Sequence, residues 1–114
     1  MTTTKSNVFE SNCQIYNAVY DYQRMMRSGI TKEEAKKNFI TKYGEPANWD
    51  TSNITTMESL FNYDNDFIDF DFDISHWDTS NVTTMERMFN EGYVRSDISN
   101  WNLSKVENIS AMFY

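Results

Sequence analysis

The sequence predicts an α/β repeat fold, in which an N-terminal αα-hairpin caps a short solenoid of strand plus short helix units. Two observations support this prediction. Apolar residues in the first third of the chain follow the spacing of amphipathic helices, and a tryptophan-led motif recurs in the remainder at Trp49, Trp77 and Trp101. With 114 residues the chain is long enough for one domain with a real core, but too short for two independent ones. We therefore expect one cooperative unit.

The first predicted element is a helix between Ser11 and Ser28. Apolar residues recur there at spacings of three and four: Ile15, Val19, Tyr22 and Met26. This is the pattern of one buried helix face. Gly29 follows directly and favours a left-handed helix end.

The second predicted helix begins after Thr31. Thr31 and Glu34 form a capping box, in which a hydroxyl and a carboxylate each bond a free backbone N–H group at the helix start. Three residues would face the core: Ala35, Phe39 and Tyr43. Gly44 and Pro46 end the helix. Together the two helices form an αα-hairpin, which we assign to residues 1–47.

The repeats are assigned to residues 48–114, divided into two and a half units: 48–75, 76–99 and 100–114. Residues 49–61 and 77–89 are identical at ten of thirteen positions, and residues 101–113 keep the Trp, Ser, Met and Phe. The three tryptophans are 28 and 24 positions apart. Periods in this range are typical of stacked supersecondary units, none of which can bury its apolar face alone.

Each unit is expected to contain a short strand, a turn and a short helix. Thr55 with Glu58, and Thr83 with Glu86, have the spacing of capping boxes for that short helix. Its inner face would carry the apolar residues Met85, Met88 and Phe89. Stacking the units would then place Trp on Trp and Phe on Phe.

The repeat core also resembles a known family. It reads Trp-Asp-Thr-Ser-Asn-Val-Thr-x-Met-x-x-Met-Phe and is preceded by Asp-Ile-Ser-x-Trp at residues 73–77 and 97–101. Both pieces are similar to the BspA-type bacterial surface-protein repeat, a leucine-rich-repeat-like family with a period of about 25 residues. The resemblance covers residues 48–114 and implies a leucine-rich-repeat-like solenoid. It further implies adhesion and protein contact rather than catalysis, in surface proteins of bacteria and mycoplasmas, in protists or in large DNA viruses of protists.

The net charge of -7 is divided unevenly along the chain. Residues 1–47 hold seven Lys or Arg and five Asp or Glu, whereas residues 48–114 hold three and twelve. A DNA-reading helix-turn-helix has the same outline as the predicted hairpin. Such domains bind through a clearly basic face, so we expect a structural hairpin and no direct nucleic-acid binding.

The residue inventory predicts no catalytic, cofactor or metal site. The single cysteine, Cys13, and the single histidine, His76, lack zinc-ligand spacing, and the chain has no glycine-rich phosphate loop. The first ten residues do not resemble a signal peptide, and no stretch approaches the roughly 18 apolar residues of a membrane span. We therefore expect a non-enzymatic intracellular protein without membrane contact, placed in a host cytoplasm or virion if its source is viral.

The first candidate contact surface is the acidic segment between Phe61 and Ser75. Apolar residues alternate with aspartates there, at Ile68, Phe70, Phe72 and Ile74. The alternation predicts a strand with one buried and one acidic face. Five aspartates are predicted to attract a basic protein partner: Asp64, Asp66, Asp69, Asp71 and Asp73. Two other uses stay open, namely binding of a cation and mimicry of nucleic acid in an inhibitor of a DNA- or RNA-binding protein.

The second candidate surface is the open C-terminal end of the third unit. The motif reaches its Phe without the polar capping unit that terminal repeats usually have. The predicted partner-binding residues are Met112, Phe113 and Tyr114. The leading functional prediction is a non-catalytic protein-binding or assembly module that contacts a protein partner or a second copy, within a larger complex or virion. The alternative is the acidic nucleic-acid mimic.

Overall fold

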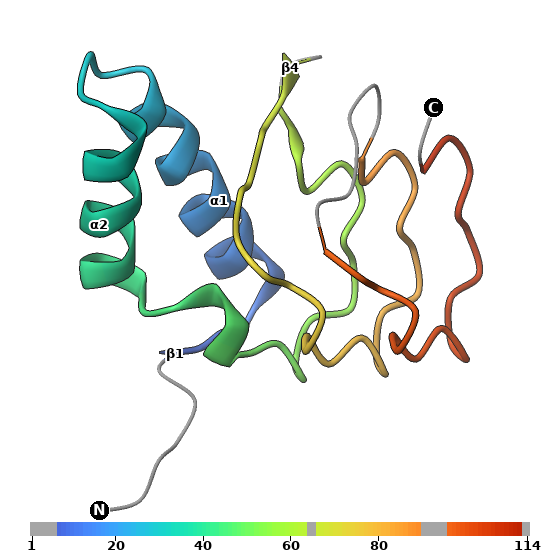
Figure 1. Ribbon diagram of the computed structural model, residues 1–114. Coiled ribbons are helices and arrows are strands. Elements are labelled where there is room, and N and C mark those ends of the chain that lie inside the picture. Colours follow the sequence, from blue (N-terminus) through green and yellow to red (C-terminus); the bar gives the residue numbers. More distant parts are fainter. Residues whose placement is uncertain (1–6, 64–65, 90–95, 113–114) are drawn as a thin grey trace, which may run out of the picture.

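The structure is a computed structural model that describes residues 7–63, 66–89 and 96–112. The elements follow in the order β1 (Asn7–Val8), α1 (Asn12–Met26), α2 (Lys32–Tyr43), the 3₁₀ helix η1 (Pro46–Asn48), β2 (Trp49–Asp50), β3 (Asn62–Tyr63) and β4 (Asp66–Phe67). β1 pairs with β2 in parallel, and β3 pairs with β4 antiparallel. The helices α1 and α2 lie at one end of the molecule, and irregular loops of the second half are stacked beside them (Figure 1).

Both predicted helices are present, close to their predicted bounds. The residues that α1 buries include three that its spacing indicates: Ile15, Val19 and Tyr22. Thr31 Oγ1 accepts a hydrogen bond from the Glu34 N–H group at 3.1 Å, which confirms the hydroxyl half of the predicted capping box. Gly29 follows α1 with φ 97°, and Gly44 ends α2 with φ 78°. Both angles lie in the left-handed region, where glycine is free of the steric penalty that other residues meet.

The predicted leucine-rich-repeat-like solenoid of strand plus short helix units is wrong. Among the described residues every helix lies before Trp49, and no strand is longer than two residues. Turns stand where the short helices of the repeats were expected. The second half consists of irregular loops, which we call turn 1 (residues 49–61), turn 2 (77–89) and turn 3 (101–112).

The absence of helix from turns 1 to 3 has a local backbone cause. Three residues at equivalent positions have positive φ, namely Ser59 at 56°, Arg87 at 58° and Ala111 at 54°. A right-handed helix needs a φ near -63° at each residue, so a left-handed residue stops it at once. The threonine that accepts a bond also lies one position later than expected: Thr56 Oγ1 accepts from the Glu58 N–H group at 3.2 Å. This spacing of two gives a tight turn instead of a helix cap.

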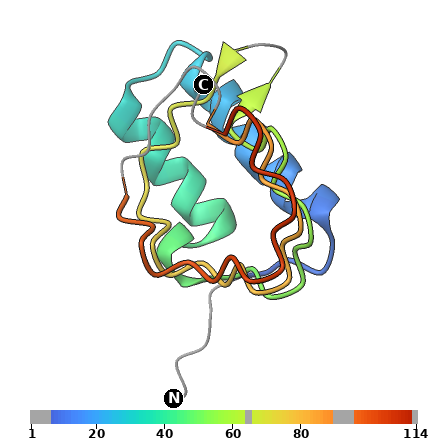
Figure 2. The same ribbon diagram turned by 90° about the vertical axis from the view of Figure 1, so that its right-hand side faces the viewer.

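The three turns nevertheless lie one on another in a constant register. Parallel bridges join Thr56 to Thr84, and Thr84 to Asn108. Backbone N–H groups of turn 1 donate to carbonyls of turn 2 in the pairs Met57 to Thr84, Ser59 to Glu86 and Phe61 to Met88. Viewed along the stack, the turns trace nearly the same outline (Figure 2). Equivalent positions are therefore 28 and 24 residues apart, as the tryptophans are.

Aromatic side chains form the centre of the stack and connect it to the hairpin. Trp49 and Trp77 are stacked with ring centroids 5.7 Å apart, and Phe61 and Phe89 are stacked at 5.4 Å. This confirms the expected pairing of Trp with Trp and Phe with Phe between turns 1 and 2. Phe39 of α2 lies against Trp49 at 5.8 Å, so the core continues from the helices into the turns without a break.

Candidate functional site

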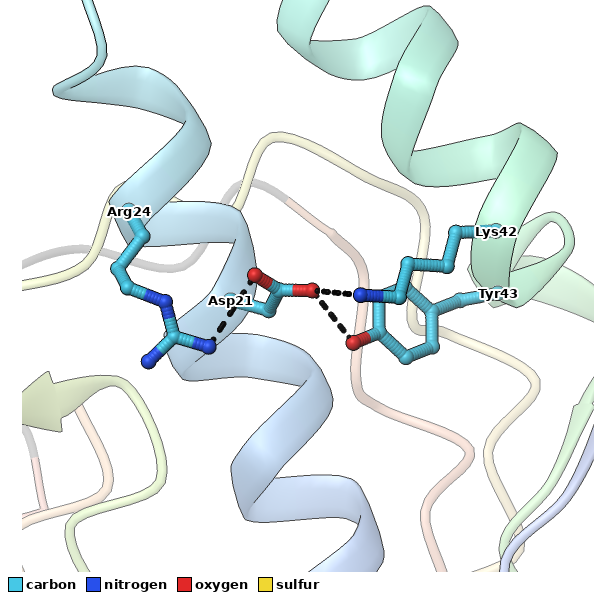
Figure 3. A network of polar contacts seen from close by, with 4 residues as sticks. All are labelled: Asp21, Arg24, Lys42 and Tyr43. Carbon is cyan, nitrogen blue, oxygen red and sulfur yellow. Dashed lines mark hydrogen bonds and ion pairs between the residues drawn. The ribbon is translucent and has the colours of Figure 1, made fainter.

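A polar network around Asp21 holds the two helices of the hairpin together (Figure 3). Asp21 Oδ2 accepts hydrogen bonds from Lys42 Nζ at 2.9 Å and from the Tyr43 hydroxyl at 2.6 Å, and Oδ1 accepts one from Arg24 at 3.2 Å. Burial acts to raise the pKa of the Asp21 carboxyl, but the bonds from Tyr43 and Lys42 outweigh it and hold this pKa below its usual value. All the donors come from the hairpin itself, so the network fastens α1 to α2.

The first face of the stack is covered by α1. Asn12 Oδ1 accepts a hydrogen bond from the Thr55 N–H group at 3.0 Å, and the Asn12 amide donates to Thr55 Oγ1 at 3.0 Å. The Tyr16 hydroxyl donates to the Glu58 carbonyl. Burial is the main cause that raises the pKa of Tyr16 to about 12, which keeps this donor protonated. Side chains of α1 thus bond backbone groups of turn 1, and we call this face the capped end.

The opposite face of the stack, on turn 3, exposes apolar side chains. Leu103 is 49% exposed and Ile109 is 58% exposed. The equivalent residues of turn 1, Thr51 and Met57, are 0% exposed. The same two positions of turn 2 are also buried, at Thr79 and Met85. We call this surface, formed around Leu103, Val106 and Ile109, the open face.

Backbone groups distinguish the open face as well. In turn 2 the N–H groups of Met85 and Arg87 donate to the carbonyls of Asn108 and Ser110 in turn 3. The equivalent N–H groups of turn 3 belong to Ile109 and Ala111, and they have no partner within the described residues. Unsatisfied N–H groups are costly to bury but readily donate to a matching carbonyl. The open face therefore combines apolar side chains with backbone donors that have no partner in the described part of the chain.

The partner-binding residues predicted at the C-terminal end are not the residues that the open face exposes. Met112 is only 7% exposed, because it packs back onto the core, while Phe113 and Tyr114 lie outside the described residues. Sequence reasoning missed Leu103 and Ile109. A signal for both was present, since turn 3 has Leu and Ile where turns 1 and 2 have Thr and Met.

Replacement of threonine by Leu103 also interrupts a series of contacts between turns. Thr51 Oγ1 donates to the Asp78 carbonyl at 3.1 Å, and Thr79 Oγ1 donates to the Asn102 carbonyl at 3.0 Å. Leu103 has no hydroxyl and cannot make the corresponding bond toward anything that covers turn 3. Turn 3 is thus chemically different from the turns that are covered by a further copy of the motif.

The acidic segment shows the predicted alternation of burial. Its apolar residues are buried at 2–7% exposure: Ile68, Phe70, Phe72 and Ile74. Asp69 and Asp71 between them are half-buried, and Asp73 is exposed. The predicted strand over residues 68–74 is wrong. β4 ends at Phe67, and the N–H groups of Phe70 and Phe72 bond the carbonyls of Ile68 and Phe70 within the segment instead of a neighbouring strand. Asp64 lies outside the described residues, and of Asp66 only the backbone is described.

Asp71 and Asp73 are both engaged by neighbouring groups. Asp71 Oδ2 lies 2.9 Å from Lys32 Nζ and 3.4 Å from Lys36 Nζ, both on α2. Asp73 Oδ1 accepts bonds from the Ser75 hydroxyl at 2.7 Å and from the Ser75 N–H group at 3.0 Å. The hydroxyl bond, with the backbone bond, lowers the pKa of Asp73. The structure therefore brings this segment onto α2 instead of leaving its charges as a free row.

The turn at Asp73 belongs to the general architecture of the repeats. The same contact from a serine two residues later occurs at Asp50, Asp78 and Asp97. Among the described residues there is no group of three or more His, Cys, Asp or Glu side chains that could hold a metal ion. Neither α1 nor α2, in the described part of the chain, is long and apolar enough to cross a membrane.

Comparison with known proteins gives one finding. The sequence pattern of a family described as "Mycoplasma protein of unknown function, DUF285" matches residues 25–114. This span begins near the end of α1 and includes α2 and all three turns. No curated protein and no solved structure gives a significant match.

Proposed function

We propose that this chain, which belongs to the DUF285 family of mycoplasma proteins of unknown function, is a non-catalytic protein-binding or assembly module of BspA-like type. The open face makes the contact. The single observation that supports this proposal is the exposure of Leu103 and Ile109, because the equivalent residues of turns 1 and 2 are buried. Apolar side chains gathered on one surface, with polar residues around them, are characteristic of protein interaction sites.

The energy available at the open face sets the size of the contact. Fully burying a Leu or Ile side chain contributes about 1.5–3 kcal/mol, so covering the exposed halves of Leu103 and Ile109 contributes roughly 2 kcal/mol in total. Micromolar binding needs about 8 kcal/mol. The partner must therefore also cover the polar rim of turn 3 and bond the N–H groups of Ile109 and Ala111.

The acidic segment is a weaker candidate for the contact. At Asp71 a basic partner would compete with Lys32 and Lys36, and at Asp73 it would meet a carboxylate whose Oδ1 already accepts bonds from Ser75. Residues 68–74 also form no strand, so their aspartates do not make a regular row like the phosphates of a DNA strand, which carries one charge per about 3.4 Å. These points favour the open face over nucleic-acid mimicry.

Affinity capture from an extract of the native source tests the proposal. We compare the wild type with Ile109→Asp on the open face and with Ile30→Asp, a matched control whose residue is 39% exposed in the loop between α1 and α2. The proposal expects a partner that wild type and Ile30→Asp retain and that Ile109→Asp loses. Identical capture by all three proteins would contradict it.

A further inference from the structure

The open face limits what can cover it. The occupant must supply apolar side chains against Leu103 and Ile109 and carbonyl groups for the N–H donors of Ile109 and Ala111. Another loop of the same kind as turns 1 and 2 fits poorly, because Leu103 cannot provide the hydroxyl bond that Thr51 and Thr79 provide. The occupant therefore differs from a simple continuation of the stack.

The capped end of another molecule is also unsuited to this role. There Asn12 and Tyr16 already bond the backbone of turn 1, and the Phe9 N–H group donates to the Asp50 carbonyl. Stacking a second molecule head to tail would have to displace α1 from its own core. Head-to-tail growth of a filament is thereby disfavoured.

The charge of turn 3 permits a like surface to approach. Among residues 101–112 only Lys105 and Glu107 are charged, so turn 3 is neutral although the chain carries -7. Turn 1, by contrast, carries Asp50 and Glu58 without any Lys or Arg. Two open faces can therefore meet without the repulsion that other pairs of surfaces on this acidic molecule would experience.

We infer that a second copy of this chain covers the open face, in a closed twofold dimer in which turn 3 of one copy meets turn 3 of the other. The inference rests on the proposed function, because it names the partner of the same surface. A twofold contact is self-complementary: Leu103 and Ile109 of each copy are buried by the other. Antiparallel approach of the two turns also offers carbonyls of one copy to the N–H groups of the other.

Sedimentation velocity of the pure chain, from about 1 to about 100 µM, tests this inference. Wild type and Ile30→Asp should form a species of twice the 13.5 kDa chain mass and nothing larger. Ile109→Asp should sediment as a monomer over the same range, with at least about tenfold weaker association. If Ile109→Asp fails to fold by circular dichroism, Leu103→Thr takes its place, since turns 1 and 2 carry threonine at that position.

The remaining outcomes are decisive in other ways. A wild type that stays monomeric, or an Ile109→Asp variant that still dimerises, overturns the inference. Oligomers that grow with concentration overturn the closed twofold arrangement. The capture experiment decides the proposed function separately. If wild type is monomeric but Ile109→Asp loses a captured protein, the dimer is wrong and the open face binds a different partner. If wild type is monomeric and capture is also unchanged, both proposals fail.

Discussion

The two ends of the stack show how a repeat can be closed and how it can be left available. At the capped end, Asn12 and Tyr16 of α1 bond the backbone groups that a neighbouring turn would otherwise bond. At the open face, Leu103 and Ile109 remain about half exposed. The two ends share the register of the stack, but they differ in side chains, with Thr51 and Met57 in turn 1 against Leu103 and Ile109 in turn 3, and in what covers them. A helix can therefore act as a substitute turn, provided that its side chains match the backbone of the repeat.

Equivalent methionine and isoleucine positions should show the largest contrast between the two ends. Met57→Ala should lower the free energy of unfolding by about 2–5 kcal/mol, because it leaves a cavity in the core. Ile109→Ala, at the equivalent position of turn 3, should lower it by less than about 1 kcal/mol, because that side chain is already exposed. Urea denaturation at low protein concentration measures both changes. Similar losses at the two positions would show that turn 3 is covered.

The stability that the Asp21 network gives to the hairpin should be lost in acid. The pKa of Asp21 is lowered in the folded protein, so its contribution to stability is present above the unfolded value of about 3.9 and is lost as the pH falls through the folded value. Asp21→Asn should cost about 1–3 kcal/mol at neutral pH and flatten this acid dependence. Denaturation curves at several pH values measure both effects. If the Asp21→Asn variant loses stability in acid as the wild type does, the acid dependence comes from other carboxylates.

Asn12, which bonds turn 1 at the capped end, should contribute less to the free energy of unfolding than a core side chain does. Asn12→Ala removes the acceptor of the Thr55 N–H group and should cost about 1 kcal/mol. Asn12→Asp keeps an acceptor but loses the donor to Thr55 Oγ1, so its loss should be smaller. Thermal denaturation ranks the three proteins. Equal stability of wild type and Asn12→Ala would mean that water replaces the cap without penalty.

The smallest expected effect concerns the left-handed residues that stop helix formation. Ala111→Gly should raise the free energy of unfolding by between zero and about 1 kcal/mol. It relieves the left-handed strain in the folded protein, but it also makes the unfolded chain more flexible. Ala47→Gly, in η1, is a half-buried control without this strain. It should destabilise by about 0.5–1 kcal/mol. A loss at Ala111→Gly equal to that at Ala47→Gly would argue against the left-handed backbone.

Local patterns explain which parts of the fold could be predicted. The helix spacing and the Thr31 cap involve residues three or four positions apart, and both are present. The register of the turns followed from the motif because like residues stack on like. The prediction of short helices in the repeats was wrong. Ser59, Arg87 and Ala111 have positive φ, and nothing in their residue types indicates this, because glycine is the residue that usually adopts such angles.

The contact surfaces depend on distances along the chain that no local pattern contains. Asp71 meets Lys36, 35 positions earlier, so pairing of the acidic segment with α2 required the tertiary structure. The exposure of Leu103 could have been suspected from the replacement of threonine in turn 3. Whether Leu103 is exposed still depends on which end of the stack α1 covers, turn 1 or turn 3. The motif alone does not distinguish these two arrangements.

Amide hydrogen exchange at equivalent positions of turns 2 and 3 shows whether turn 3 is open in the monomer and covered in the dimer. The N–H groups of Met85 and Arg87 bond turn 3 and should exchange slowly at all protein concentrations. Those of Ile109 and Ala111 should exchange fast in dilute protein and become protected as concentration rises and the open face is covered. Protection of Ile109 and Ala111 in dilute protein would mean that turn 3 is already covered in the monomer, and fast exchange that persists at the highest concentration would mean that no second copy covers it.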